Sequence, residues 1–539
     1  MQFLPPTTRR VFGQVWRLAL PVIVANVLQS LVNVADVFLA GRLGPVEIAA
    51  VGMGTSVRML VMVGIMAVTV GCMALAAQAR GAGDDFELSR VARQSLSLAV
   101  LLSLLLGAVG FLGAGPILAF LNSGGDPLAV ELGTAYLQIL FAGTVFMMLN
   151  FTISSLMQGA GDTITPLYIS AGMNVANVAF STALMFGAGP LPALGVTGIA
   201  LGTVLSRILA TFAGLLLFYS GGNAVRLLPG SYLPDRDMFR QILSIGIPSG
   251  LQGIARNGSQ ILVLRIVTST AAGTYGASAL AIGIQVESLA FMPGLAVSVA
   301  ATSLVGQALG GWQVEEAKER GNVAVALGAV LMGALGLLLW LFAEQLVRLF
   351  DPTAHPTVVA AGTSYLRINA LSQPLLAVAM VVNGALRGAG DTRPTLVSTI
   401  IGRWLVVVPL SWFLAFPVGM GVDGVWWALF AGTAVQATHV AARWLGGKWT
   451  SVGLRKSRLY RLHLRFLPEE LQHRYLTEVK APLMAQGNTR ERVEEHGVSY
   501  RLPGGVVELE FDESYRIVEG RELLAGCQSP LAGGSRPSG

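Results

Sequence analysis

Long runs of apolar residues recur along most of this 539-residue chain, and they constrain its fold more than any other feature. A helix that crosses the hydrocarbon layer of a bilayer needs about 20 mostly apolar residues. The runs lack the alternation over about 10 residues that is typical of membrane-barrel strands. The sequence therefore predicts an all-α polytopic membrane protein with twelve transmembrane helices. They are expected at 14–40, 46–78, 92–121, 130–157, 163–187, 194–219, 240–268, 276–308, 321–350, 358–386, 394–417 and 421–446.

Composition agrees with this class and excludes several others. Only 12% of the residues are charged, against about 25% in soluble domains. A net charge of +6 would suggest nucleic acid in a soluble protein. Here the basic residues flank apolar runs, so we expect a lipid bilayer as the partner and no nucleic acid. The two cysteines, Cys72 and Cys527, predict neither a disulfide framework nor a metal site.

The distribution of Lys and Arg predicts the orientation of the chain. Thirteen of them lie at the N-terminus and in or beside the loops that follow the second, sixth, eighth and tenth predicted helices. The opposite loops hold two, Arg42 and Arg348. Cytoplasmic loops carry the excess of basic residues. We therefore expect a multi-pass protein of the inner (plasma) membrane with both termini in the cytoplasm.

The chain contains an internal repeat. The segment Gly-Ala-Gly-Asp-Thr at 159–163 recurs 229 residues later at 388–392, and Gln78 matches Gln307 at the same offset. Each half holds six predicted helices, so both halves enter the membrane from the same side, as in transporters built from parallel repeats. A duplicated scaffold without transport is the alternative. The predicted parts are a six-helix bundle at 1–222, a cytosolic linker at 223–240, a second six-helix bundle at 241–447 and a cytosolic tail at 448–539.

The tail differs in composition from the rest of the chain. Residues 448–539 carry 14 basic and 12 acidic side chains. We expect a small cytosolic α+β appendage of unknown function, with a β-hairpin between Val498 and Phe511 around a Pro-Gly-Gly turn. Its basic part, 448–480, either touches anionic lipid or is a solvated linker helix.

A charged residue inside a membrane span is costly, so it is a functional candidate. Asp36 lies in the first predicted helix, with Asn33 and Gln29 three and seven residues before it on the same stripe. A carboxylate facing a cavity there can bind a proton or a sodium ion. In the alternative interpretation Asp36 is a buried carboxylate paired with a basic residue such as Arg58 or Arg207.

Three polar residues share the fifth predicted helix. Asn177 and Ser181 are four residues apart and therefore on one face, and Asn174 lies one turn earlier. Their side-chain oxygens can coordinate an ion or accept from a protonated carboxyl group. They can equally hold two helices together.

Glu287 is the main buried acid of the second half. Arg256 and Arg265 of the preceding predicted helix are close enough in sequence to neutralise it, which leaves a structural ion pair as the alternative to a functional role. Arg403 and Arg443 are expected near helix ends, with their charged groups extending to the membrane surface.

Together these features resemble the multidrug and toxic compound extrusion (MATE) family. The similarity rests on two six-helix halves, the repeated Gly-Ala-Gly-Asp-Thr turns, Val-Gly-Gln-x-Leu-Gly at 305–310 and Phe-Met-Pro-Gly at 291–294, and covers about residues 10–446. It implies two bundles around a central cleft. It also implies antiport of small cationic or amphipathic compounds against H⁺ or Na⁺ by alternating access, in a protein that works as a monomer and needs no cofactor beyond the coupling ion.

The resemblance also implies roles for single residues. Asp36 matches the family's carboxylate in the first helix. Asn177 and Ser181 stand where the family often has Asn followed four residues later by an acid or amide. Arg256 stands eight residues after Pro248, where some members have an acid. The candidate coupling-ion site is Asp36, Asn177, Asn174, Ser181 and Asn33, and the candidate residues of the substrate cleft are Gln29, Glu287 and Arg256.

Two other functions are compatible with such a chain. A flippase for lipid-linked oligosaccharides, from the same superfamily, needs cationic residues in its cleft, and Arg58, Arg207, Arg256 and Arg265 are candidates. A membrane-embedded transferase needs acid, His or metal-binding clusters near one interface. The sequence shows none, so we predict no catalytic residues and no enzyme activity.

Overall fold

The computed structural model describes residues 6–121, 127–187, 192–222, 224–455, and four strands between 490 and 522. Within 33–41 and 45–61 it leaves out many side chains, and those of Asn33, Asp36 and Arg58 are among them. The side chains of the strands are also outside the described part.

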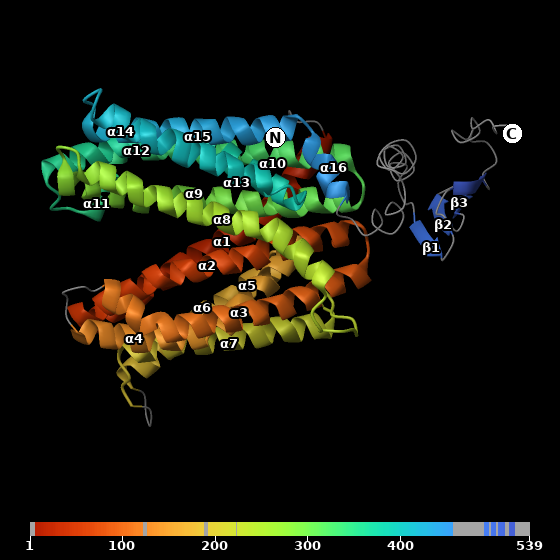
Figure 1. Ribbon diagram of the computed structural model, residues 1–539, viewed down its shortest axis with the longest axis horizontal. Coiled ribbons are helices and arrows are strands. Elements are labelled where there is room, and N and C mark those ends of the chain that lie inside the picture. Colours follow the sequence, from red (N-terminus) through yellow and green to blue (C-terminus); the bar gives the residue numbers. More distant parts are fainter. Residues whose placement is uncertain are drawn as a thin grey trace.

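The body of the molecule is helical, and its helices form two groups that lie side by side (Figure 1). The first half contains α1 Pro6–Leu43, α2 Pro45–Gly81, α3 Asp85–Leu121, α4 Pro127–Ala142, α5 Thr144–Gly159, α6 Ile164–Phe186 and α7 Val196–Ser220. The second contains α8 Arg236–Thr268, α9 Gly273–Gly310, α10 Val314–Leu341, α11 Ala343–Phe350, α12 Pro356–Gly388, α13 Arg393–Thr399, the π-helix η1 Ile400–Val407, α14 Val408–Ala415, α15 Gly421–Leu445 and α16 Lys448–Arg455.

Membrane-spanning character is clear along most of this body. In the described residues, nine helices are long and apolar enough to cross a bilayer. The predicted span 130–157 is divided into α4 and α5, which meet at a bend of 48° and make a tenth span if they act as one. The predicted span 394–417 corresponds to one continuous span, Arg393–Ala415, in which the π-helix η1 lies between α13 and α14. The long helices α8 and α15 are not among these spans.

The first helix of each half crosses into the other half. Val11 and Val22 of α1 share a core with α9, α10 and α12, whereas Leu43 at the other end of α1 packs against the core of α4, α6 and α7. In the reciprocal arrangement, Met238 and Ile245 of α8 belong to the core of α2, α3 and α5. Farther along, α8 contacts α13, η1 and α14. These two crossing helices connect the halves.

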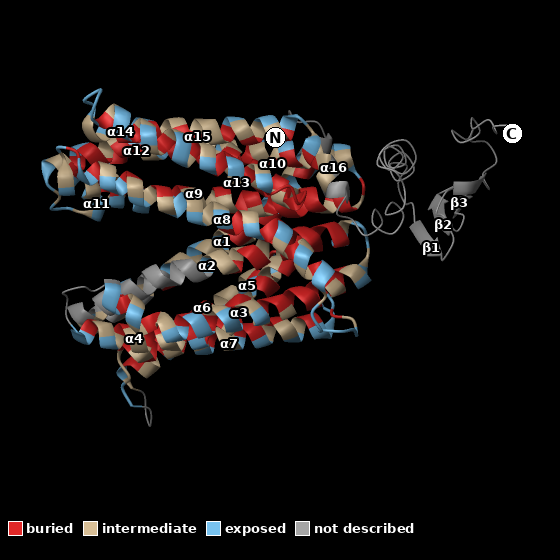
Figure 2. Ribbon diagram, viewed as in Figure 1, coloured by how far each residue is buried: buried red, intermediate tan, exposed pale blue. Residues whose placement is uncertain are grey.

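Reciprocal glycine contacts bring the halves together at the end that holds α16 and the start of α1. A Cβ atom added to Gly81 of α2 would lie 1.9 Å from the Gln307 carbonyl oxygen of α9. A Cβ added to Gly310 of α9 would lie 2.0 Å from the Gln78 carbonyl oxygen of α2. Both positions therefore exclude any side chain. Buried residues concentrate where α2 and α9 approach this end (Figure 2).

Two side-chain hydrogen bonds follow the same symmetry. Gln78 Nε2 donates to the carbonyl oxygen of Gly388, 2.8 Å away in the second half. Its counterpart Gln307 donates from Nε2 to the carbonyl oxygen of Gly159, 3.0 Å away in the first half. The two glutamines are 229 residues apart, and so are the two glycines that accept from them. The two hydrogen bonds are therefore equivalent, and the internal repeat forms a two-fold symmetric contact between the halves. We call these two hydrogen bonds and the Gly81 and Gly310 contacts the glycine–glutamine contact.

The two copies of Gly-Ala-Gly-Asp-Thr form tight turns, as the sequence predicts. Gly161 and Gly390 have φ of +90° and +76°, a region that favours glycine. Asp162 caps the next helix, since its Oδ1 accepts from the backbone N–H of Thr165 at 3.0 Å. Its counterpart Asp391 instead forms an ion pair with Arg443 of α15, at 2.7 Å. The equivalent aspartates of the two copies therefore have different partners.

The linker between the halves is fastened to α3. Gln94 Nε2 donates to the Leu233 carbonyl oxygen at 2.9 Å, and Gln94 Oε1 accepts from the backbone N–H of Asp235. Asp235 is the N-cap of α8, because its Oδ1 accepts from the backbone N–H of Asp237 at 3.0 Å. Its other carboxylate oxygen accepts from Arg90 of α3. This hydrogen bond lowers the pKa of Asp235.

Asp235→Asn should reduce the thermal stability of the detergent-solubilised protein, because the amide can cap α8 but cannot pair with Arg90. Asp235→Ala should cost more, since losing an N-cap costs about 1 kcal/mol. A carboxyl group whose pKa is lowered on folding stabilises above its unfolded pKa, about 3.9. The melting-temperature difference between wild type and Asp235→Asn should therefore be constant near neutral pH and shrink below about pH 4.

The matched control is Asp237→Asn, two residues along in the first turn of α8, where the side chain is exposed. It should leave the melting temperature close to wild type. An equal loss in both variants would assign the effect to total charge rather than to the Arg90 contact.

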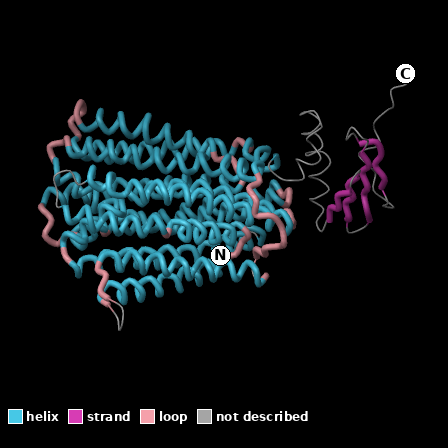
Figure 3. The backbone as a smooth tube through the Cα atoms, turned by 60° about the horizontal axis from the view of Figure 1, so that its bottom comes forward, coloured by secondary structure: helices cyan, strands magenta, loops and turns pink. Residues whose placement is uncertain are grey.

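The tail contains β1 Arg490–Glu494, β2 Gly497–Leu502, β3 Gly505–Phe511 and β4 Ile517–Glu522. They form one antiparallel sheet in the order β1-β2-β3-β4 (Figure 3). The pairing of β2 with β3 corresponds to the predicted hairpin, whose turn lies outside the described residues. Most of the basic segment 448–480 is also outside them.

Candidate functional site

Glu287 of α9 is held by two polar residues of α12. Its Oε2 accepts from the hydroxyl of Tyr365 at 2.7 Å, and its Oε1 accepts from Gln373 Nε2 at 3.4 Å. The Tyr365 ring packs edge-on against Trp426 at a centroid distance of 4.9 Å. Gln373 Oε1 is buried without a hydrogen-bond partner among the described residues. The second half therefore contains a carboxylate, that of Glu287, beside a hydrogen-bond acceptor, Gln373 Oε1, that has no donor among the described residues.

The alternative in which Glu287 pairs with Arg256 or Arg265 is not seen among the described residues. Over the described part of the chain, no Lys, Arg or His nitrogen lies within the 4.0 Å of an ion pair with Glu287. The charge that acts on Glu287 is that of Arg403. The guanidinium of Arg256 lies over the ring of Phe291, 5.9 Å from its centroid.

Arg403 also differs from its predicted place at a helix end. It lies within η1, between α13 and α14, in the interior of the span Arg393–Ala415. π-Helices are rare in proteins, and those that occur often lie at functional sites. The neighbouring Trp404 donates from Nε1 to the Ala255 carbonyl oxygen of α8 at 2.9 Å, which attaches η1 to α8. Arg443, by contrast, lies in the last turn of α15, as predicted.

The polar residues of α6 are buried against α7. Asn177 Nδ2 donates to Thr203 Oγ1 at 3.1 Å, and Ser181 Oγ donates to the Ile199 carbonyl oxygen at 3.4 Å. These contacts match the helix-joining interpretation. Asn177 Oδ1 and Asn174 Nδ2 nevertheless remain buried without partners in the described residues. A free amide oxygen is a ligand for a cation or for a protonated acid.

The helix that carries Asp36 and Asn33 lies beside α6, although the side chains of these two residues are outside the described part of the chain. The backbone of α1 packs along α6, with further contacts to α7. Gln29, one of the predicted cleft residues, is half-buried on α1. The structure thus brings the helix of Asp36 next to the helix of Asn174, Asn177 and Ser181.

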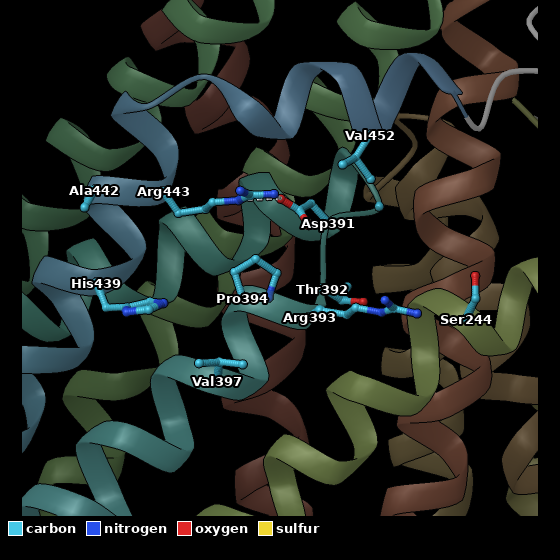
Figure 4. Close-up of a pocket in the computed structure, with 11 residues that line it drawn as sticks. Ser244, Asp391, Thr392, Arg393, Pro394, Val397, His439, Ala442, Arg443 and Val452 are labelled. Atoms are coloured by element: carbon cyan, nitrogen blue, oxygen red, sulfur yellow. Dashed lines mark hydrogen bonds and ion pairs between the residues drawn. The ribbon is translucent and has the colours of Figure 1, made fainter. Parts of the chain in front are cut away.

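A cavity of about 780 Å³ opens at the α16 end of the second half, away from Glu287 (Figure 4). Asp391 and Arg443 form their ion pair on its wall, and Arg393 extends toward Ser244 of α8. His439 is the single histidine of the lining. Across the described residues, no group of three or more His, Cys, Asp or Glu side chains is arranged to hold a metal ion.

Sequence reasoning missed several residues of these sites. Tyr365 belongs to the repeated segment, in which Tyr136 is its counterpart, so the repeat was a usable signal. Gln373 and Arg387 carried no such signal. Gln252 of α8 accepts from Arg387 at 3.0 Å and donates to Thr399 at 2.9 Å, a contact that only the packing of three helices creates.

Comparison with known proteins agrees with this architecture. The sequence profile of the MatE family matches residues 21–183 and 248–413. "Probable multidrug resistance protein NorM" of Thermotoga maritima is 30% identical over 443 residues, covering 80% of this chain and 92% of that protein. "Multidrug resistance protein NorM" of Burkholderia vietnamiensis is 30% identical over 445 residues, covering 81% and 95%.

Solved structures share the fold. One described as an outward-facing conformation of a multidrug resistance MATE family transporter superimposes with a TM-score of 0.75 at 23% identity, covering 84% of this chain and 99% of that one. A crystal structure of MATE in complex with MaL6 gives a TM-score of 0.74 at 23% identity, covering 84% and 100%. With two profile matches, one in each half of the repeat, this chain belongs to the multidrug and toxic compound extrusion (MATE) family of efflux transporters.

Proposed function

We propose that this protein is a secondary-active exporter that antiports small amphipathic or cationic compounds against H⁺ or Na⁺ by alternating access. The relatives named for multidrug resistance support export of organic compounds. The glycine–glutamine contact supports alternating access, because one end of the body is held shut by interactions that are few, reciprocal and breakable. A ligand shifts such a two-state protein only by its different affinity for the two states.

The coupling ion is proposed to bind between α1 and α6, at Asp36 with Asn177, and with Asn174, Ser181 and Asn33 nearby. The observation that carries this proposal is the buried Oδ1 of Asn177, which has no partner among the described residues, on a helix that packs against α1. Binding of a proton or sodium ion would neutralise Asp36 and change the packing of α1, which reaches into both halves.

The wider architecture is part of the proposal. It comprises twelve spans in two six-helix bundles at 1–222 and 241–447, a cytosolic linker at 223–240, and a cytosolic α+β tail at 448–539. The start of α1 and α16 lie at the same end of the body (Figure 1), which supports placing both termini on one side, the cytoplasm, of an inner-membrane monomer.

Efflux from proteoliposomes tests the function directly. With the full chain reconstituted, tetraphenylphosphonium, an amphipathic cation, should leave the vesicles when an inward gradient of one coupling ion is imposed. Proton and sodium gradients are applied separately, with an ionophore that dissipates each as the control. Movement that needs neither gradient would contradict antiport.

One observation favours a second candidate, the lipid-linked oligosaccharide flippase. The second half holds several arginines without acidic partners among the described residues, which would suit a pyrophosphate group. A flippase should scramble or flip labelled polyprenyl-pyrophosphate oligosaccharide in the same vesicles and leave tetraphenylphosphonium unmoved.

A further inference from the structure

Three arginines of the second half, Arg256, Arg387 and Arg403, form a group that we call the arginine cluster. A guanidinium group carries five N–H donors. In the described part of the chain these three groups make one hydrogen bond, from Arg387 to Gln252. The Nε of Arg387 is buried and has no partner among the residues that the structure describes. No described carboxylate lies within 4.0 Å of the three groups.

The cluster is assembled by α8, α12 and η1. Gln252 of α8 bridges Arg387 of α12 to Thr399 at the start of η1. The chain neighbours of Arg403 and Arg256 are in direct contact, since Trp404 Nε1 donates to the Ala255 carbonyl oxygen at 2.9 Å. Glu287 attracts Arg403 from α9. Three positive charges and one negative charge therefore share this part of the membrane body.

Such an excess of positive charge is expensive inside a membrane. A charged side chain in a span faces the protein interior or a water-filled cavity, because lipid does not solvate it. Arg256 lies 20 residues after the start of α8 and is exposed. Its guanidinium lies beside the apolar ring of Phe291. Its guanidinium is thus expected to face the aqueous pathway rather than lipid. A cationic compound would be repelled there, whereas an anion would supply the missing partner.

We propose that the arginine cluster binds the anionic group of an amphipathic substrate, so that organic anions are a transported class. This inference rests on the proposed export function and adds organic anions to its substrates. Carboxylates, sulfonates and phosphates match the fork of N–H donors on arginine. The bound anion would compete with Glu287 for Arg403, and Phe291 would contact the apolar part of the molecule beside Arg256.

Binding and transport of one probe separate this inference from the proposed function. The probe is taurocholate, an amphipathic sulfonate. It should raise the melting temperature of the full-length protein in detergent, and radiolabelled taurocholate should leave proteoliposomes under an imposed ion gradient. Stabilisation without transport of taurocholate would support the cluster as a binding site and contradict organic anions as a transported class. Transport of tetraphenylphosphonium without any taurocholate binding would overturn the inference and leave export intact.

Variants locate the site within the cluster. Arg256→Gln, Arg387→Gln and Arg403→Gln should each weaken taurocholate binding about tenfold or more, since a hydrogen bond to a charged group is worth about 1.5–3 kcal/mol. Arg256→Lys should recover part of the loss. The control is Arg367→Gln on α12, whose guanidinium stacks over Trp340 at 5.8 Å. Unchanged taurocholate affinity in all three Gln variants would contradict the proposal. Where a variant fails to fold, the thermal shift of the wild type still tests it, because a wild type that taurocholate does not stabilise would contradict the proposal.

Discussion

Asp36→Asn should abolish ion-driven efflux while leaving the protein folded and in the membrane. An amide cannot take up a proton and carries no charge for a sodium ion to neutralise, so both conformations would have the same affinity for the ion. Coupling free energies are commonly 1–3 kcal/mol, or about 5–150-fold in affinity. We therefore expect gradient-driven efflux to fall by about 100-fold, measured as tetraphenylphosphonium release from proteoliposomes.

Two further variants make this test specific. Asp36→Glu keeps the carboxyl group and should keep part of the activity. Asp423→Asn makes the same chemical change at an exposed residue of α15, where Asp423 accepts from Ser364 at 2.6 Å, and should transport like wild type. Asn177→Ala should weaken the ion dependence less than Asp36→Asn, because it removes one neutral ligand. Full efflux by Asp36→Asn would place the coupling ion elsewhere.

Gly81→Ala and Gly310→Ala should each prevent the two halves from closing at the α16 end. The added methyl carbon would lie 1.9 Å or 2.0 Å from a backbone oxygen of the facing helix, so the helices have to separate. Overpacking of this kind costs about 1–3 kcal/mol. The two changes should have similar effects because the contacts are related by the repeat. Efflux should fall about tenfold or more, since alternating access needs both closed states.

Spin labels can report the separation directly. The labels are placed at Asp85 and Glu315, which are exposed at the starts of α3 and α10, in a protein whose own cysteines are replaced by serine. The distance between the two labels should increase in both glycine variants. Gly172→Ala is the matched control, because no atom lies within 4 Å of its added Cβ. Wild-type distances and efflux in Gly81→Ala would show that the glycine–glutamine contact does not govern closure.

The sequence by itself determined the class of fold and the repeat. A backbone in lipid has to satisfy its hydrogen bonds within each segment, so long apolar runs without alternation become helices whatever their neighbours are. The turns at Gly161 and Gly390 are likewise determined by the local sequence, since they depend on a backbone conformation that glycine adopts easily. The offset of 229 residues also identifies Gln78 and Gln307 as equivalent positions of the repeat.

Only the tertiary structure decided which polar groups meet. Arg256 is nearer to Glu287 in sequence, yet the partners of Glu287 are Tyr365 and Gln373 of α12. Likewise the repeat did not reveal that each glutamine bonds to the opposite half. Hydropathy and turn chemistry are set within a few residues. The rotation and crossing of helices depend on packing summed over whole surfaces, so partners distant in the chain become visible only in the assembled fold.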